Sequence, residues 1–358
     1  MNQTTFTIIN AVKIFVMTTM AFFLTVAITP LWTKILHKYK LGKGVVRINN
    51  APIFSEMHKK KVGIPTMGGL VIWATVAILT FFFWFASQFA PHSMLAKLNF
   101  LSRSQTWVPL AALLVSAVFG FIDDLLGILR IGPGGGGLRM RDRLIMYALV
   151  GAGGAWWFYY KLGYNFINVP FMGDWIIGWW YIPFFIFIIV ASAFSANETD
   201  GLDGLVGGIF LTTFGAYSAI AFDQGRIDLV VFISAIMGAL IAFLWYNIYP
   251  AKFFMGDTGS MSLGVTLGVV AMLTNTPFLL LPIAFIFIIE SGSVLVQLAS
   301  KKLRGKKVFL STPIHHHFEA LGWPETQVTM RFWMISTIGA IIGLIIFLID
   351  SKIPPLFR

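Results

Sequence analysis

The stretch WYIPFFIFIIVASAFSANETDGLDGL, residues 180–205, is an apolar run that ends abruptly in amide and acidic side chains. About 20 consecutive apolar residues are enough to cross the hydrocarbon core of a bilayer as a helix. Carboxylates are costly beside hydrocarbon, so acids at the end of such a run need a cation or a reaction to justify them. The stretch therefore predicts a membrane helix with a functional site at one end.

Composition extends this interpretation to the whole chain of 358 residues, of which 57% are hydrophobic and 11% are charged. Soluble domains carry about 25% charged residues, which excludes that class. One bundle of spans accommodates this length, so we expect a single transmembrane domain over residues 1–358. The net charge of +11 arises from basic residues between apolar runs, which favours topology signals over a nucleic-acid partner. The absence of cysteine excludes disulfides and thiolate sites.

Ten runs along the chain reach spanning length. They lack the alternation with a period of two that marks the strands of a membrane barrel, so they predict helices. The expected fold class is all-α and polytopic, with about ten transmembrane helices, the first of them a retained span rather than a signal peptide. The runs are residues 8–35, 66–88, 106–128, 140–161, 176–196, 202–222, 228–249, 257–275, 277–300 and 330–350.

The basic residues predict how this bundle is oriented. Most lysines and arginines follow the first, third, seventh and ninth runs, and the positive-inside bias makes that side cytoplasmic. Both termini are then expected on the outer side, and the acidic clusters on the cytoplasmic side. Between the runs we expect a short hairpin over 164–178, an interfacial segment over 89–105 and a flexible glycine linker over 132–137.

Asp123 and Asp124 end the third run, in the sequence GFIDDLLG. An acidic pair at a helix end can simply reach water at the headgroup level. Adjacent carboxylates repel each other, however, and a divalent cation or a proton between them relieves that repulsion. Both interpretations of the pair stay open.

Two further acidic segments end or begin apolar runs. Asn197, Asp200 and Asp203 follow one another at intervals of three residues, so in a helix they would share one face. Asp200 could instead be the N-cap of the next helix. Asp257 starts the eighth run and has the same two interpretations, an N-cap or an oxygen ligand for Mg²⁺.

Three other polar positions are candidates for substrate contacts or for structural roles. His315, His316 and His317 are consecutive and cannot all face one ion, which favours phosphate binding or proton handling over a zinc site. Lys61 is either a topology anchor or a phosphate clamp. Glu290 lies inside the ninth run, where it is either functional or paired with a neighbouring helix.

Several motifs, in order along the chain, resemble those of one known family. They are IPTMGG at 64–69, FIDD at 121–124, NETDGLDGL at 197–205, WYN at 245–247, FMGDTGS at 254–260 and PIHHHFE at 313–319. Together they resemble the phospho-N-acetylmuramoyl-pentapeptide transferases, within the polyprenyl-phosphate N-acetylhexosamine-1-phosphate transferase superfamily. The acidic motifs suit the whole superfamily, whereas PTMGG and the triple histidine favour the muramoyl branch.

The resemblance implies a homodimer in the inner, cytoplasmic membrane of a bacterium. It would transfer phospho-MurNAc-pentapeptide from UDP-MurNAc-pentapeptide to undecaprenyl phosphate with Mg²⁺, giving lipid I and UMP for peptidoglycan synthesis. By the same resemblance Asp257 is catalytic and the metal ligand, and Asp123 and Asp124 are catalytic and act on the lipid phosphate. The implied nucleotide contacts are Asn197, Asp200, Asp203 and Phe254. The implied phosphate and sugar contacts are Lys61, Thr66, Asn247, His315, His316 and His317.

One position departs from the family pattern. The family usually carries a lysine three residues after the second aspartate, where this chain has Gly127, and Arg130 could substitute for it. The nearest alternative function is that of a sibling transferase that uses UDP-GlcNAc. A cation-coupled transporter is the alternative from a different class, and it would place its acids near the bilayer midplane rather than at the ends of the spans.

Overall fold

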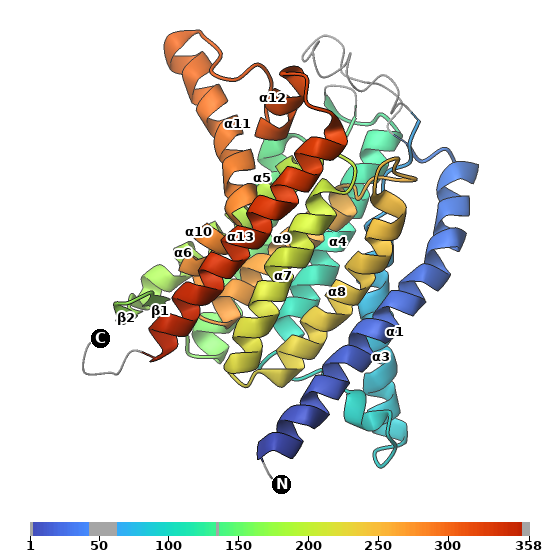
Figure 1. Cartoon of the computed structure of the whole chain (residues 1–358), viewed down its shortest axis with the longest axis vertical. Helices are drawn as coiled ribbons and strands as arrows, with labels where there is room; N and C mark the ends of the chain where they lie inside the picture. Colours follow the sequence, from blue (N-terminus) through green and yellow to red (C-terminus); the bar gives the residue numbers. More distant parts are fainter. Residues whose placement is uncertain (1–2, 43–62, 134–135, 353–358) are drawn as a thin grey trace.

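The computed structural model describes residues 3–42, 63–133 and 136–352, and it is a bundle of long helices (Figure 1). Each of the ten predicted runs forms one helix or a broken pair of helices, which confirms the all-α polytopic class. In chain order the helices are α1 (Gln3–Lys38), α3 (Leu70–Phe89), α4 (Trp107–Ile128), α5 (Met140–Trp156), α6 (Tyr181–Thr199), α7 (Leu205–Asp223), α8 (Ile227–Asn247), α9 (Asp257–Leu273), α10 (Leu280–Ile283), α11 (Phe285–Arg304), α12 (Ile314–Ala320) and α13 (Glu325–Lys352).

Length and hydropathy separate these helices into two groups. Among the described residues, 7 helices are long and apolar enough to cross a membrane, and a broken pair raises this to 8. Helices α5 and α9 are shorter, at 17 residues each. Helix α5 continues directly into the π-helical turn η4 (Trp157–Lys161), which lengthens it toward the hairpin.

The ninth predicted run is broken rather than straight. The segment formed by η6 (Pro277–Leu279) and α10 meets α11 at an angle of 86°. Pro282 lies two residues before the break, and proline cannot donate a helical N–H and clashes with the preceding turn. Beyond the break, α11 leans away from the rest of the bundle (Figure 1).

Helix α9 occupies the centre of the bundle, and every one of its residues is buried. It packs mainly against α4 and α6. Its small residues allow this close packing, since a Cβ added to Gly264 would lie 2.8 Å from the Cα of Ala193 in α6. Because α9 is enclosed on all sides, its first residue, Asp257, is held in the middle of one end of the bundle.

The two ends of the bundle carry different structures. The short helix α12 lies at the end where α9 begins, whereas α1 begins and α13 ends toward the opposite end (Figure 1). That opposite end also carries an antiparallel hairpin of β1 (Phe166–Val169) and β2 (Gly173–Ile176), in which Phe166 pairs with Ile176. The hairpin confirms the prediction for 164–178. The segment 89–105 forms turns and the short 3-10 helix η2 (Ala96–Leu98).

Candidate functional site

The predicted acidic residues come together around the start of α9. The Oδ2 atom of Asp124, from α4, accepts a hydrogen bond from the backbone N–H of Thr258 at 3.0 Å. The Oδ2 atom of Asp200, after α6, accepts one from the N–H of Gly256 at 2.8 Å. Backbone N–H groups at a helix start have no partner within the helix and carry partial positive charge. Two other helices therefore supply the carboxylates that satisfy the start of α9.

The residues at which α7 and α9 begin test the N-cap interpretation of Asp200 and Asp257. The N-cap of α9 is Gly256 and the N-cap of α7 is Gly204, and neither makes a side-chain capping bond. Asp200 is instead the C-cap residue of α6. The N-cap interpretations are therefore wrong.

Arg143, from the first turn of α5, contacts one residue from each of the three predicted acidic segments. Its Nε lies 2.5 Å from Asp123 Oδ2, and its Nη2 lies 3.5 Å from Asp257 Oδ2. Its Nη1 donates a hydrogen bond to Asn197 Oδ1 at 3.1 Å. Asn197 in turn donates from Nδ2 to Asp257 Oδ1 at 2.5 Å. One guanidinium thus joins oxygen atoms from α4, α6 and α9.

The segment before α5 delivers this arginine to Asp123. The backbone N–H of Leu138 donates to Asp123 Oδ1 at 2.6 Å. Gly137 has a φ of +86°, and a Cβ there would lie 3.0 Å from Asp123 Oδ1. Glycine permits both the left-handed backbone and the close approach. The described end of the predicted glycine linker therefore lies against Asp123.

Asn197, Asp200 and Asp203 do not share one helical face, because α6 ends at Thr199. Each side chain points to a different partner. Asn197 contacts Asp257 and Asp200 contacts Gly256, as described above, whereas Asp203 Oδ2 accepts from the N–H of Ala251 at 2.9 Å. The equal spacing of three residues thus reflects three separate contacts, one made from the last turn of α6 and two from the loop that follows it.

The PTMGG motif packs directly against the FMGDTGS motif. Gly68 N–H donates to Phe254 O at 2.8 Å, and Phe254 N–H donates to Pro65 O at 2.8 Å. Thr66 Oγ1 donates to Asp124 Oδ1 at 3.3 Å. Gly256 has a φ of +74°, and a Cβ on it would lie 2.5 Å from Asp124 Oδ2. Thr66 is therefore part of the frame that fixes Asp124.

Asn247 also binds backbone groups of the neighbouring loops. Its Oδ1 accepts from Gly204 N–H at 3.1 Å, and its Nδ2 donates to Phe253 O at 2.8 Å. The residue is buried. These contacts place Asn247 as a connection between the loop before α7 and the loop before α9.

Glu290 and the histidines form a second cluster beside the acidic loop. Glu290 Oε2 lies 2.9 Å from His315 Nδ1, and His316 Nδ1 lies 2.7 Å from Glu319 Oε2. The ring centroids of His315 and His316 are 4.0 Å apart. A Cβ on Gly201 would lie 2.3 Å from His315 Nε2, so this ring packs on the acidic loop. The pairing interpretation of Glu290 is confirmed, with α12 as the neighbouring helix.

The charge state of His316 follows from its surroundings. Burial, with His315 as the next cause, lowers the pKa of His316 from its ordinary value to about 4, although Glu319 raises it. The ring is therefore neutral near pH 7. His317 is half-buried, and its Nδ1 accepts from the N–H of Leu310 at 3.2 Å.

Lys61 and Arg130 are the two remaining basic residues that the sequence analysis singled out. Lys61 lies outside the described residues. Arg130 is exposed beyond the end of α4, and the guanidinium that contacts Asp123 is that of Arg143. Arg143 was missed because the arginines at 139–143 were interpreted only as topology signals. Its spacing gave a signal, since Arg143 precedes Tyr147, Gly151 and Ala155 at intervals of four, and those three residues form the buried face of α5.

The oxygen atoms around Arg143 fit a hard divalent cation. Asp123, Asp257 and Asn197 offer carboxylate and amide oxygens, which Mg²⁺ prefers, and all three already contact one positive group. No set of three His, Cys, Asp or Glu side chains in the described ranges is arranged to hold a metal ion. Mg²⁺ commonly binds one or two carboxylates and keeps waters or substrate phosphates as its other ligands. The donor set therefore fits Mg²⁺ together with a phosphate substrate.

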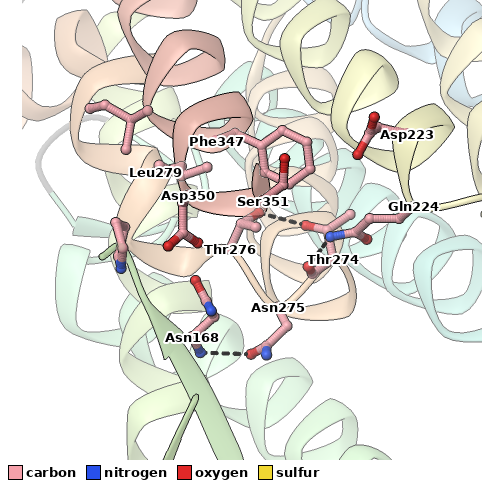
Figure 2. Close-up of a pocket in the computed structure, with 12 residues that line it drawn as sticks. Asn168, Asp223, Gln224, Thr274, Asn275, Thr276, Leu279, Phe347, Asp350 and Ser351 are labelled. Carbon is pink, nitrogen blue, oxygen red and sulfur yellow. Dashed lines mark hydrogen bonds between the residues drawn. The ribbon is translucent and has the colours of Figure 1, made fainter. Parts of the chain in front are cut away.

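A separate polar cavity lies at the hairpin end of the bundle (Figure 2). It has a volume of about 300 Å³, and its lining includes Asp223, Gln224, Asn275 and Asp350. Asp350 Oδ1 accepts from the N–H of Phe171 at 2.9 Å, which fastens the hairpin to α13. The cavity thus belongs to the contacts that hold the hairpin, at the end of the bundle away from Asp257.

Fold and site together define a polytopic membrane protein with carboxylate and amide oxygens gathered around one arginine at one end of its bundle. Residues 106–275, which carry Asp123, Asn197, Arg143 and Asp257, match a family model described as glycosyl transferase family 4. This match covers the helices α4 to α9 that build the centre.

Comparison over nearly the whole chain narrows this class to one family. The chain is 36% identical over 342 residues to the phospho-N-acetylmuramoyl-pentapeptide-transferase of Chloroflexus aggregans, covering 92% of this chain and 88% of the relative. It is 35% identical to that of Geobacillus thermodenitrificans, covering 91% and 95%, and 38% identical to that of Levilactobacillus brevis, covering 80% and 85%. The chain belongs to the phospho-N-acetylmuramoyl-pentapeptide-transferase family.

Proposed function

We propose that the protein transfers phospho-MurNAc-pentapeptide from UDP-MurNAc-pentapeptide to undecaprenyl phosphate, forming lipid I and UMP in peptidoglycan synthesis. Family membership supports the reaction class. The observation that carries the proposal is the convergence of Asp123, Asn197 and Asp257 on one cationic group at the end of the bundle. Phosphoryl transfer needs oxygen atoms held in line and negative charge neutralised, and this centre offers both ligands and a cation.

The proposed metal is Mg²⁺, held by Asp257 with oxygen atoms of Asp123 and Asn197 as further donors. When bound it would neutralise charge on the diphosphate of the nucleotide substrate. Asp257 is well placed because it starts the enclosed helix α9, so its position depends little on loop motion. Asp124 is held by Thr66 and Thr258 and keeps the start of α9 in register with α4.

In the proposed reaction an oxygen of the lipid phosphate attacks the phosphorus bonded to the sugar oxygen. A bond forms between that oxygen and phosphorus, the bond from the phosphorus to the bridging diphosphate oxygen breaks, and UMP leaves with the electron pair. The lipid phosphate is largely anionic near neutral pH, so a carboxylate base need remove at most its last proton. We therefore favour direct transfer over an aspartyl intermediate on Asp257.

The shape of the bundle supports a lipid acceptor. Helix α11 leaves the bundle after the break at Ala284 (Figure 1). Its apolar residues Leu295, Leu298 and Leu303 are exposed. An apolar face of this kind is compatible with lipid on the side from which a polyprenyl chain would arrive. Transporters place their acids at the midplane, whereas this centre lies at the helix ends.

We place the centre on the cytoplasmic side of the bacterial inner membrane, because basic residues close α11 at that end with Lys301, Lys302 and Arg304. A homodimer is proposed from the family resemblance and is tested by the mass of the purified protein in lipid nanodiscs.

The experiment for the reaction supplies the purified protein with undecaprenyl phosphate, Mg²⁺ and one of two donors. UMP and a lipid-linked muramoyl pentapeptide are expected from UDP-MurNAc-pentapeptide. Transfer from UDP-GlcNAc alone would favour the sibling transferase instead. Ion-dependent uptake of solute into vesicles without any UMP release would favour the transporter.

A further inference from the structure

Arg143 occupies the oxygen cluster that we propose for the divalent cation. Its guanidinium contacts Asp123, Asp257 and Asn197 simultaneously, and those are the three side chains whose oxygens fit Mg²⁺. A guanidinium and a divalent cation have like charges, and like charges at this separation oppose each other's binding in a partly buried site. The two therefore compete for the same oxygen atoms.

The two ion-pair contacts of Arg143 differ in length. Its Nε lies 2.5 Å from Asp123, whereas its Nη2 lies 3.5 Å from Asp257. The contact with the proposed metal ligand is thus the longer one. An arginine can release Asp257 by turning the outer part of its side chain while it stays paired with Asp123.

Exposure indicates the direction in which the guanidinium can move. The side chain of Arg143 is 24% exposed, whereas those of Asp123 and Asp257 are 0% and 8% exposed. The arginine is therefore the most exposed of the three side chains, so its outer part can turn toward solvent.

We infer that Arg143 is a resident counter-ion of this centre, which holds Asp257 and Asn197 in place before the divalent cation binds and yields Asp257 to it. The inference rests on the proposed function. Arg143 thereby weakens cation binding in the substrate-free protein, and the guanidinium released from Asp257 is then free to face the phosphates of the substrate. This role also explains how a chain with Gly127 in place of the family lysine still has a mobile positive charge beside Asp123.

The fork of arginine is needed for this role. A guanidinium presents five donors in a rigid plane and can contact three partners at once, whereas a lysine ammonium is a compact point charge. Arg143→Lys keeps the charge but cannot reproduce all three contacts. It should therefore compete with the metal less effectively than arginine and more effectively than a neutral residue.

The test measures binding of Mn²⁺, as a spectroscopic substitute for Mg²⁺, to the purified full-length protein without substrates at pH 8. Electron paramagnetic resonance reports free Mn²⁺ directly, so the readout does not depend on turnover. Arg143→Gln should bind Mn²⁺ about tenfold more tightly than the unchanged protein, because one competing positive charge is removed. Arg143→Lys should fall between the two, and the same substitutions should reduce UMP release.

Arg141→Gln is the matched control, since Arg141 is on the same helix, is 76% exposed and pairs with Asp142. Its affinity for Mn²⁺ should equal that of the unchanged protein. If Arg143→Gln and Arg143→Lys bind Mn²⁺ no more tightly than the unchanged protein does, the counter-ion role is wrong. The proposed reaction still stands in that case, provided that the unchanged protein forms UMP. If neither the unchanged protein nor the variants bind Mn²⁺ and UMP forms without any divalent cation, the metal proposal fails together with this inference.

Discussion

Glu290 Oε2 of α11 lies 2.9 Å from His315 Nδ1 of α12, and both side chains are fully buried. This pair connects α11, the helix that leaves the bundle, with α12. The His315 ring packs on Gly201, whose neighbour Asp200 accepts a hydrogen bond from Gly256, the residue before Asp257. A continuous chain of contacts therefore runs from α11 to the proposed metal ligand.

Substitution of Glu290 tests how much its pairing with His315 contributes to the stability of the protein. Glu290→Ala leaves His315 Nδ1 without its buried partner, which should cost about 1–3 kcal/mol of stability. Glu290→Gln keeps an acceptor of similar shape and should retain most of the stability. The melting temperature and UMP release are measured for both variants. Equal melting temperatures for the unchanged protein and Glu290→Ala would show that this pair contributes nothing.

Gly201 should tolerate no side chain. A Cβ there would lie 2.3 Å from His315 Nε2 and 3.2 Å from His316 Nε2, so Gly201→Ala must displace a buried ring or the acidic loop. We expect at least about a tenfold loss of turnover, since an ångström-scale misplacement in a catalytic site costs up to about a hundredfold. Gly292→Ala is the control, because nothing lies within 4 Å of its Cβ position. Equal activity of the two variants would contradict the packing of His315 on this loop.

Because the pKa of His316 is lowered in the folded protein, we expect the protein to lose stability as the pH falls below 6.5. Its pKa of about 4 in the folded protein lies below the ordinary value of 6.5, so the unfolded chain binds a proton first as the pH falls. The stability from the neutral, buried ring is present above pH 6.5 and is lost between pH 6.5 and 4, by roughly 2 kcal/mol at pH 5. The melting temperature is measured from pH 7.5 to 5. His316→Gln should show a smaller fall, and an identical fall in both proteins would assign the effect to other groups.

Substitution of Gly127 by lysine tests whether the absence of the family lysine limits the rate of UMP release. Arg143 already supplies a positive charge beside Asp123, so Gly127→Lys should leave UMP release unchanged or raise it. The rate is compared at saturating substrates. A severe loss would instead assign Gly127 a packing role, for which the Cα of Gly127 offers a reason, since it lies 3.2 Å from the position that a Cβ on Gly136 would take.

The sequence predicted the helices well because each span is a long apolar run, a signal that depends only on local composition. It did not predict the break before Phe285, since residues on both sides of Pro282 are equally apolar. The acids were found through their cost beside hydrocarbon. Their partners were not, because Asp200 with Gly256 and Glu290 with His315 are contacts between segments far apart in the chain. Arg143 looked like one of several topology arginines until the fold placed it against Asp123.

Asp257 provides the most direct test of the central claim, which is metal-dependent transfer at the start of α9. UMP release from UDP-MurNAc-pentapeptide is followed against Mg²⁺ concentration in bilayers that contain undecaprenyl phosphate, for the unchanged protein, Asp257→Asn and the control Asp174→Asn on the hairpin. We expect saturable Mg²⁺ dependence for the unchanged protein and the control, and a loss of at least about 100-fold for Asp257→Asn at an unchanged melting temperature. Near-normal, Mg²⁺-dependent activity of Asp257→Asn would remove Asp257 from the metal site and contradict the proposed centre.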